Sequence, residues 1–119
     1  MNKLNHLIYL FMQPLKDKNI LVIGATGGIG SRTAKLLAGS GAKLFLTGRN
    51  SEKLQAVAGS CNVSPDRCLA LDCSQPNSVN ALKENYFQQF SSIDILINAA
   101  GIGIIKAMDT LDETDFLHT

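Results

Sequence analysis

Residues 22–33 read VIGATGGIGSRT, and the glycines at positions 24, 28 and 30 decide the fold. The stretch follows a run of branched apolar residues over positions 19–24, which is typical of a strand buried on both faces. A segment with helical spacing begins at Gly28 and is followed by Gly39 and Gly41, which favour a helix end. The sequence therefore predicts a strand, a tight glycine turn and a helix from Gly28 to about Leu37.

The same alternation of short apolar runs and longer amphipathic segments continues along the chain. Further strands are predicted at 43–47, 67–72 and 93–98. Further helices are predicted from a cap at Asn50 through Val57, from a cap at Ser74 through about Phe90, and from a capping box formed by Thr110 and Glu113. Helices between successive strands require crossover connections and a parallel sheet. We therefore expect an α/β fold, a Rossmann-like doubly wound parallel sheet that is incomplete, with about four strands and intervening helices.

Helical spacing also predicts which side chains face the core. The expected inward residues are Ile29, Thr33, Leu36 and Leu37 in the first helix, Leu54 and Val57 in the second, and Val79, Leu82, Tyr86 and Phe90 in the third.

The composition of the chain limits the functional classes to which the protein can belong. The chain has 119 residues and a net charge of +1, so it has no broad basic surface of the kind that binds nucleic acid. Its three cysteines, Cys61, Cys68 and Cys73, have no CxxC spacing and no nearby histidine, which predicts reduced thiols and no metal site. The apolar segment 7–12 is too short to span a membrane. We expect a cytoplasmic protein with an N-terminal extension over 1–14 and one domain over 15–119.

Each glycine of the turn is expected to have its own structural role. Gly24 lets the chain leave the strand, Gly28 lets backbone amides approach a pyrophosphate, and Gly30 removes a side chain where helix and strand pack closely. The helix N-terminus then offers free N–H groups to an anion, and the Thr26 hydroxyl adds a donor. No Lys-Ser or Lys-Thr closes the turn, which excludes a P-loop. A glycine turn can also serve chain reversal alone, but its place between strand and helix predicts dinucleotide binding.

Three motifs together resemble the short-chain dehydrogenase/reductase family over about residues 15–119. GATGGIG over 24–30 is similar to the glycine motif of that family, LALDCS over 69–74 to its third-strand segment, and ILINAAG over 95–101 to its fourth-strand N-N-A-G motif. Ile23 and Ala99 differ from the residues that are commoner there. The resemblance implies that the cofactor contacts the glycine turn, Asp72 and Cys73 beside the adenine, and the fourth-strand end. The residues implied from the first and last of these motifs are Gly24, Thr26, Gly27, Gly28, Ile29 and Gly30, together with Asn98, Ala99, Ala100 and Gly101.

Several of these residues have a purely structural interpretation as well. Asp72 can cap the following helix, Asn98 can hold neighbouring strands, and Cys73 can act as a small filler. Gly101 can simply permit a turn.

The end of the second strand distinguishes NAD from NADP. An acidic residue about 20 positions past the glycines binds the ribose hydroxyls in NAD-dependent proteins. Gly48 stands there and leaves room, and Arg49 offers a planar charged fork suited to a phosphate. The alternative is a solvated arginine in a turn. We assign Arg49 and the adjacent Asn50 to the cofactor site and expect NADP as the cofactor.

The catalytic residues that the resemblance implies are a tyrosine with a lysine four residues later. The only tyrosines are Tyr9 and Tyr86, and Gln13 and Phe90 stand four residues after them. No catalytic residue is therefore assigned. We expect the truncated, NADP-binding half of an oxidoreductase that transfers hydride between NADP(H) and a small carbonyl or alcohol substrate in the intact enzyme, inactive as this chain alone.

Two alternatives stay open at this point: a non-enzymatic dinucleotide-binding redox sensor and a methyltransferase, the latter disfavoured by Gly48 and Arg49. In the intact enzyme the fourth strand is an interior strand, so its edge is expected to be unpaired here, which predicts a homo-oligomer. Neither a membrane nor a nucleic acid is expected as a partner.

Overall fold

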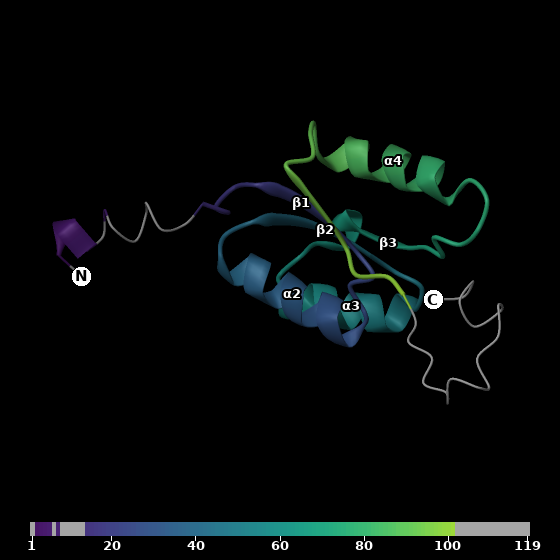
Figure 1. Cartoon of the computed structure of the whole chain (residues 1–119), viewed down its shortest axis with the longest axis horizontal. Coiled ribbons are helices and arrows are strands. Elements are labelled where there is room, and N and C mark those ends of the chain that lie inside the picture. Colours follow the sequence, from purple (N-terminus) through teal and green to yellow (C-terminus); the bar gives the residue numbers. More distant parts are fainter. Residues whose placement is uncertain (1, 6, 8–13, 102–119) are drawn as a thin grey trace, which may run out of the picture.

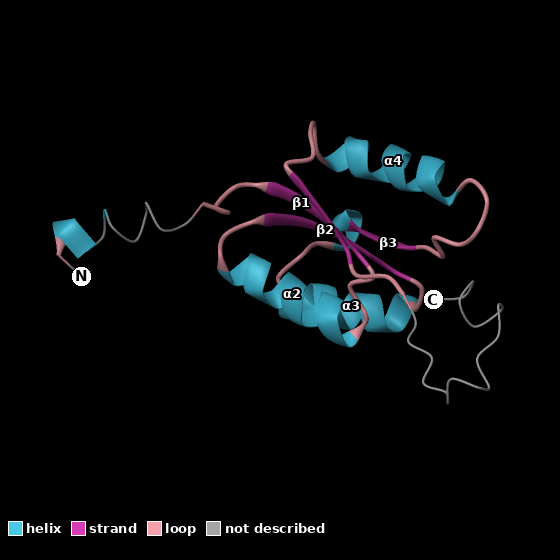
Figure 2. Ribbon diagram, viewed as in Figure 1, coloured by secondary structure: helices cyan, strands magenta, loops and turns pink. Residues whose placement is uncertain are grey.

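The computed structural model describes residues 2–5, 7 and 14–101, and within this part of the chain four parallel strands form one sheet. The order across the sheet is β3-β2-β1-β4 (Figure 2). The strands are β1 (Asn19–Ile23), β2 (Lys43–Gly48), β3 (Cys68–Ala70) and β4 (Ile95–Asn98). β1 pairs with β2 on one side and β4 on the other, so the chain reverses its direction of progress across the sheet after β3.

Helices cover both faces of the sheet (Figure 1). They are α2 (Gly28–Gly39), α3 (Ser51–Ser60) and α4 (Ser78–Gln89), and a short 3₁₀ helix, η1 (Pro65–Arg67), leads into β3. The helices α2 and α3 lie together on one face, and α4 lies on the other (Figure 1). The described part of the chain is therefore a three-layer α/β fold, which confirms the predicted fold class.

Alternate residues of the central strands face opposite layers. Ile20 and Val22 of β1 pack with the residues of α2 and α3, whereas Leu21 packs in the cluster on the α4 side. All three have at most 3 % of their surface exposed. A run of branched apolar side chains is therefore required in β1, because both of its faces lie inside the protein.

The core on the α4 face is aromatic. Phe45 of β2 lies against Tyr86 of α4, with ring centroids 5.4 Å apart, and Tyr86 stacks on Phe90 at 5.0 Å. The Tyr86 hydroxyl donates a hydrogen bond of 2.7 Å to the carbonyl oxygen of Ser92. The guanidinium of Arg67 lies 4.6 Å from the centre of the Phe90 ring, where a cation is attracted by the ring face.

The inward face of α2 differs from the prediction. The buried residues are Gly30, Ala34 and Leu37, whereas Ile29 and Leu36 are 80 % and 74 % exposed. Leu37 is buried as predicted and Thr33 is half-buried, whereas the prediction was wrong for Ile29 and Leu36 because it followed the larger apolar side chains. The helix instead turns its smallest residues to the sheet, which allows its backbone to approach β1 closely.

The start of α4 also differs from the prediction. The helix begins at Ser78 with Asn77 as its N-cap, in the left-handed conformation (φ 64°) and without a side-chain cap hydrogen bond. Ser74 instead lies in the preceding turn, and Val79, predicted to face inward, is 66 % exposed. Leu82, Tyr86 and Phe90 are buried as predicted.

The second helix follows its prediction. The side-chain oxygen of Asn50 accepts a hydrogen bond of 3.0 Å from the amide of Lys53, and Leu54 is buried while Val57 packs against the same core. The capping box at Thr110 and Glu113 lies outside the described residues. No helix in the described ranges is long and apolar enough to cross a membrane.

Candidate functional site

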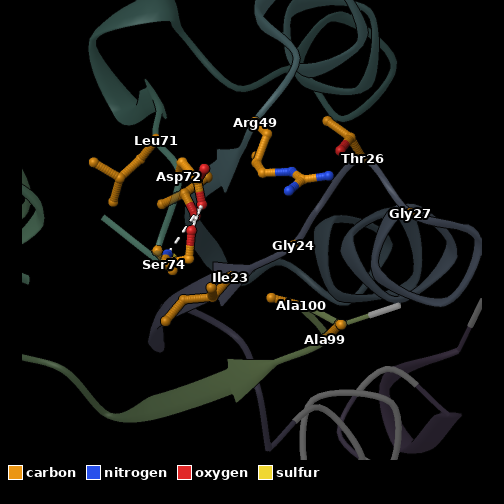
Figure 3. A pocket seen from close by; sticks show the side chains of 14 residues that line it. Ile23, Gly24, Thr26, Gly27, Arg49, Leu71, Asp72, Ser74, Ala99 and Ala100 are labelled. Atoms are coloured by element: carbon orange, nitrogen blue, oxygen red, sulfur yellow. Dashed lines mark hydrogen bonds between the residues drawn. The ribbon is translucent and has the colours of Figure 1, made fainter. Parts of the chain in front are cut away.

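A cavity of about 550 Å³ opens at the carboxyl ends of the strands (Figure 3). The turn after β1 and the segment after β4 form one side, and the ends of β2 and β3 form the other. This is the point where the strand order reverses, since β2 and β4 lie on opposite sides of β1. In open α/β sheets the crevice outside such a reversal is the usual place for a ligand.

The turn after β1 is fixed by its backbone. Gly24 has φ +79°, a conformation that L side chains rarely adopt. The amides of Gly24 and Ala25 both donate to the carbonyl oxygen of Thr47, at 3.1 and 2.8 Å. The turn is thereby tied to the end of β2. A Cβ atom at position 24 would also lie 2.5 Å from the amide nitrogen of Ala100, so the β4 end packs directly on this glycine.

Position 30 requires glycine for steric reasons, and position 28 does not. A Cβ atom at Gly30 would overlap the carbonyl oxygen of Gly24, which confirms that this glycine allows the helix to pack closely on the turn. At Gly28 a Cβ atom would meet nothing within 4 Å. No steric contact in the described part of the chain therefore requires a glycine at position 28.

The N-terminus of α2 is open to an anion. Its N-cap is Gly27, which has no side chain to cap the helix, and the first turn carries no acidic residue. The first amides of a helix have no acceptor within the helix and carry a partial positive charge. This helix end is therefore available to a phosphate, and Gly27 itself lines the cavity.

The space beside Gly48 is filled, contrary to the prediction that glycine leaves room there. A Cβ atom at position 48 would lie 2.6 Å from Cγ2 and 3.0 Å from Oγ1 of Thr26. The sequence could not show this, because Thr26 reaches Gly48 only once the turn has folded back onto β2. Arg49 is exposed, and its side chain extends across the cavity toward Thr26 (Figure 3).

Asp72 is held by its own turn. The hydroxyl and the amide of Ser74 donate to Oδ1 of Asp72 at 2.7 and 3.0 Å (Figure 3). These two hydrogen bonds lower the pKa of Asp72 below its ordinary value, with smaller contributions from Gln75 and from the charge of Arg49. Asp72 therefore presents a carboxylate to the cavity. It does not cap the following helix, because α4 begins six residues later.

The end of β4 completes the other side. The side-chain oxygen of Asn98 accepts a hydrogen bond of 3.1 Å from the amide of Ala100, and the amide of Ala99 donates to the carbonyl of Ile23 at 2.8 Å. The first contact gives the Asn98 side chain a structural role within its own segment, whereas Ala99 and Ala100 line the cavity.

Most of the predicted site residues come together in this cavity, and some do not. Those that line it are Gly24, Thr26, Gly27, Arg49, Asp72, Cys73, Ala99, Ala100 and Gly101. Those outside the lining are Gly28, Ile29, Gly30, Asn50 and Asn98. The lining also includes residues that we did not assign from the sequence, namely Ile23, Thr47, Gly48, Leu71 and Ser74. Their positions at the ends of predicted strands were the available signal.

Thr47 has an unusual environment for a cavity residue. Its side chain is fully buried, and its hydroxyl oxygen has no hydrogen-bond partner. A buried hydroxyl group without a partner lowers the free energy of unfolding by about 1–3 kcal/mol relative to one that is hydrogen-bonded. The carbonyl of the same residue, in contrast, accepts two hydrogen bonds.

Tyrosine and cysteine are the other reactive side chains among the described residues, and of these Cys73 is exposed at the cavity. Tyr86 is 1 % exposed and belongs to the aromatic core, as its helical spacing predicted, while Tyr9 lies outside the described residues. The three cysteines are free, and burial raises the pKa of Cys61 and Cys68. Among the described residues no group of three or more His, Cys, Asp or Glu side chains could hold a metal ion.

Residues 18–119 match the short chain dehydrogenase family. The chain belongs to this family. The short-chain dehydrogenases are oxidoreductases that bind nicotinamide dinucleotides, and the glycine turn, the Asp72 segment and the β4 end occupy one cavity, as the resemblance of their motifs implied.

Relatives of known sequence agree with this family. An uncharacterized oxidoreductase of Staphylococcus saprophyticus is 37% identical over 91 residues, which are 76% of this chain and 37% of that protein. An uncharacterized oxidoreductase of Staphylococcus aureus strain USA300 is 41% identical over 90 residues, or 76% of this chain and 39% of that protein. The chain thus spans less than half the length of the relatives that it matches.

Solved structures show the same fold. A short-chain type dehydrogenase/reductase from Mycobacterium marinum superimposes with a TM-score of 0.77 at 28% identity, over 92% of this chain and 45% of that one. A short chain dehydrogenase from Bacillus anthracis gives a TM-score of 0.74 at 28% identity, over 87% and 42% of the two chains.

Proposed function

We propose that this chain is the cofactor-binding half of an NADP-dependent oxidoreductase, which in its intact form transfers hydride between NADP(H) and a small carbonyl or alcohol substrate. The observation that carries the proposal is the cavity itself, with an uncapped helix N-terminus on one side and Arg49 on the other. A dinucleotide phosphate has negative charge at two separate places, the pyrophosphate and the ribose phosphate. The cavity offers a positive group for each.

Different residues of the chain would bind different parts of the cofactor. The first amides of α2 and the Gly27 backbone would hold the pyrophosphate, because an anion is stabilised at a helix N-terminus. The Arg49 guanidinium would hold the ribose phosphate through charge-assisted hydrogen bonds. The Asp72 carboxylate, whose pKa is lowered by the hydrogen bonds from Ser74, would accept a hydrogen bond from the amino group of the adenine. The nicotinamide, when bound, supplies the group that accepts or donates hydride.

The experiment compares the two cofactors. Calorimetric titration of the full chain with NADP and NAD should show tighter binding of NADP. Arg49→Asp should weaken binding of NADP by roughly tenfold to a hundredfold, since a hydrogen bond to a charged group contributes about 1.5–3 kcal/mol. Binding of NAD should change little.

A control variant distinguishes the effect of the change in net charge from the loss of the Arg49 side chain in the cavity. Arg32 is exposed on α2 and outside the cavity lining, so Arg32→Asp makes the same change in net charge without removing the cavity group. It should leave the preference for NADP in place. Equal weakening of both cofactors by Arg49→Asp would contradict the assignment of NADP.

We also propose a homo-oligomer in the cytoplasm. Within the described sheet β4 is an edge strand, and Leu96 on it is 53 % exposed. An exposed apolar edge favours association with another strand. Light scattering with size-exclusion chromatography should show a species larger than one chain, and a monomer at high concentration would contradict this proposal.

A further inference from the structure

The contact between Thr26 and Gly48 links two segments that are far apart in the sequence. Thr26 belongs to the turn after β1, and Gly48 ends β2. The nearest atoms to a Cβ at position 48 all belong to the Thr26 side chain, with Cγ2 at 2.6 Å, Oγ1 at 3.0 Å and Cβ at 3.4 Å. Approaches below 3.0 Å require one of the two groups to move.

Backbone conformation is not the reason for glycine at this position. Among the described glycines only Gly24 and Gly41 have a positive φ. Position 48 therefore does not need glycine for its backbone conformation, and the nearest obstacle to a Cβ atom there is the Thr26 side chain.

Thr26 has little freedom to move aside. A β-branched side chain has few accessible χ1 rotamers, and here both of its branches approach position 48. Clearing the space requires a rotation of the Thr26 side chain about χ1 or a shift of the turn backbone. That rotation redirects the methyl and hydroxyl groups of a residue that lines the cavity beside Arg49, so it changes the cavity at the same time.

We propose that Thr26 is a specificity-determining residue, which keeps an acidic side chain out of position 48 and so makes cofactor preference a joint property of Thr26, Gly48 and Arg49. The effect on cofactor preference rests on the proposed NADP function, because an NAD-selective site needs an acidic residue at the end of β2. A single substitution at position 48 is then insufficient to convert the preference. Removing the Thr26 side chain at the same time is required.

The steric part is tested without any cofactor. Gly48→Ala should lower the Tm of the full chain by roughly 5 °C, and the same substitution in a Thr26→Ala background should lower it much less. Thr26→Ser removes Cγ2 only and should give an intermediate result. Gly59→Ala is the matched control, because a Cβ atom there meets nothing within 4 Å. An equal loss from Gly48→Ala in both backgrounds would overturn the inference.

The selectivity part is tested by calorimetry with NADP and NAD. Gly48→Asp alone should bind NADP at least roughly tenfold more weakly, with no gain in NAD affinity. The double variant Thr26→Ala with Gly48→Asp should bind NAD at least roughly tenfold more tightly than Gly48→Asp alone, which corresponds to about 1.4 kcal/mol. The inference is overturned if Gly48→Asp alone binds NAD as tightly as the double variant, or if the double variant gains nothing.

The two tests also separate this inference from the proposed function. If the wild-type chain shows no preference for NADP, the proposed cofactor is wrong. The Tm comparison still decides whether Thr26 excludes a side chain at position 48.

Discussion

The glycine-turn side of the cavity is built from backbone contacts, whereas the side formed by the ends of β2 and β3 is built from side chains. On the first side, the turn is fixed by the positive φ of Gly24 and by two hydrogen bonds to the Thr47 carbonyl. On the second, the Ser74 hydroxyl holds Asp72 by a hydrogen bond, and Arg49 is an exposed side chain that lines the cavity. Substitutions at Gly24 and Gly30 should therefore affect folding, and those at Arg49, Asp72 and Ser74 should mainly affect which ligand is bound.

The largest effect is expected at Gly30. Gly30→Ala introduces a Cβ atom that overlaps the Gly24 carbonyl, so either the helix or the turn must move. We expect the free energy of unfolding to fall by more than about 3 kcal/mol, measured by urea denaturation of the full chain.

Gly28→Ala is the control for that comparison, because space is available there. It should change the free energy of unfolding by less than about 1 kcal/mol while weakening cofactor binding. If Gly28→Ala destabilised the chain as much as Gly30→Ala, the two glycines would not have the different roles described above.

A smaller effect is expected at Asn50, which follows β2 and lies outside the cavity lining. Asn50→Ala removes the cap of α3 and should lower the free energy of unfolding by about 1 kcal/mol. Asn77→Gly is a matched control, since Asn77 is an N-cap without a side-chain hydrogen bond and lies in a conformation that glycine adopts freely. A change in the ratio of NADP to NAD affinity on Asn50→Ala would show that Asn50 also contacts the cofactor.

Thr47→Val should be neutral or stabilising. The hydroxyl has no partner, so its removal loses no hydrogen bond and replaces a buried polar group with a methyl group. A gain of up to about 1 kcal/mol in the free energy of unfolding is expected from chemical denaturation. A loss of comparable size would mean that the hydroxyl has a partner in solution.

The smallest effect concerns the ionisation of Asp72. Its pKa in the folded chain is lowered, so the stability that it contributes is present above its unfolded pKa and is lost as the pH falls through the folded pKa. Ser74→Ala should raise the pKa of Asp72, and Arg49→Gln should raise it less, because the Ser74 hydrogen bonds are the larger cause. Carbon-13 chemical shifts of the Asp72 carboxyl group during a pH titration measure both. A larger rise in the pKa of Asp72 for Arg49→Gln than for Ser74→Ala would show that the charge of Arg49 lowers this pKa more than the Ser74 hydrogen bonds do.

The fold was predictable because its strands follow simple rules. β1 and β2 are short apolar runs between turn residues, and the helices between them require parallel pairing. The inward face of α2 was predicted only in part: Leu37 is buried as expected, whereas Gly30 and Ala34 carry little hydrophobic signal even though both are buried. Their burial follows from how closely the helix approaches the turn, which depends on tertiary structure.

The candidate site was predictable wherever a motif uses the backbone. Gly24 and Gly30 have the roles that their spacing indicated. Side-chain orientation was harder to predict, since the hydroxyl of Ser74 bonds to Asp72 instead of capping α4, and the methyl group of Thr26 fills the space beside Gly48. Both depend on which of several available partners a short side chain meets after folding.

The carbonyl oxygen of Thr47 has a consequence for how variants of this protein are interpreted. It accepts two hydrogen bonds from the turn, and every amino acid carries the same carbonyl group. A side-chain substitution at position 47, alanine included, therefore leaves this acceptor in place and reports only on the buried side chain. Only replacement of the peptide bond itself, for instance of an amide by an ester through chemical synthesis, would reveal how much the turn depends on this atom.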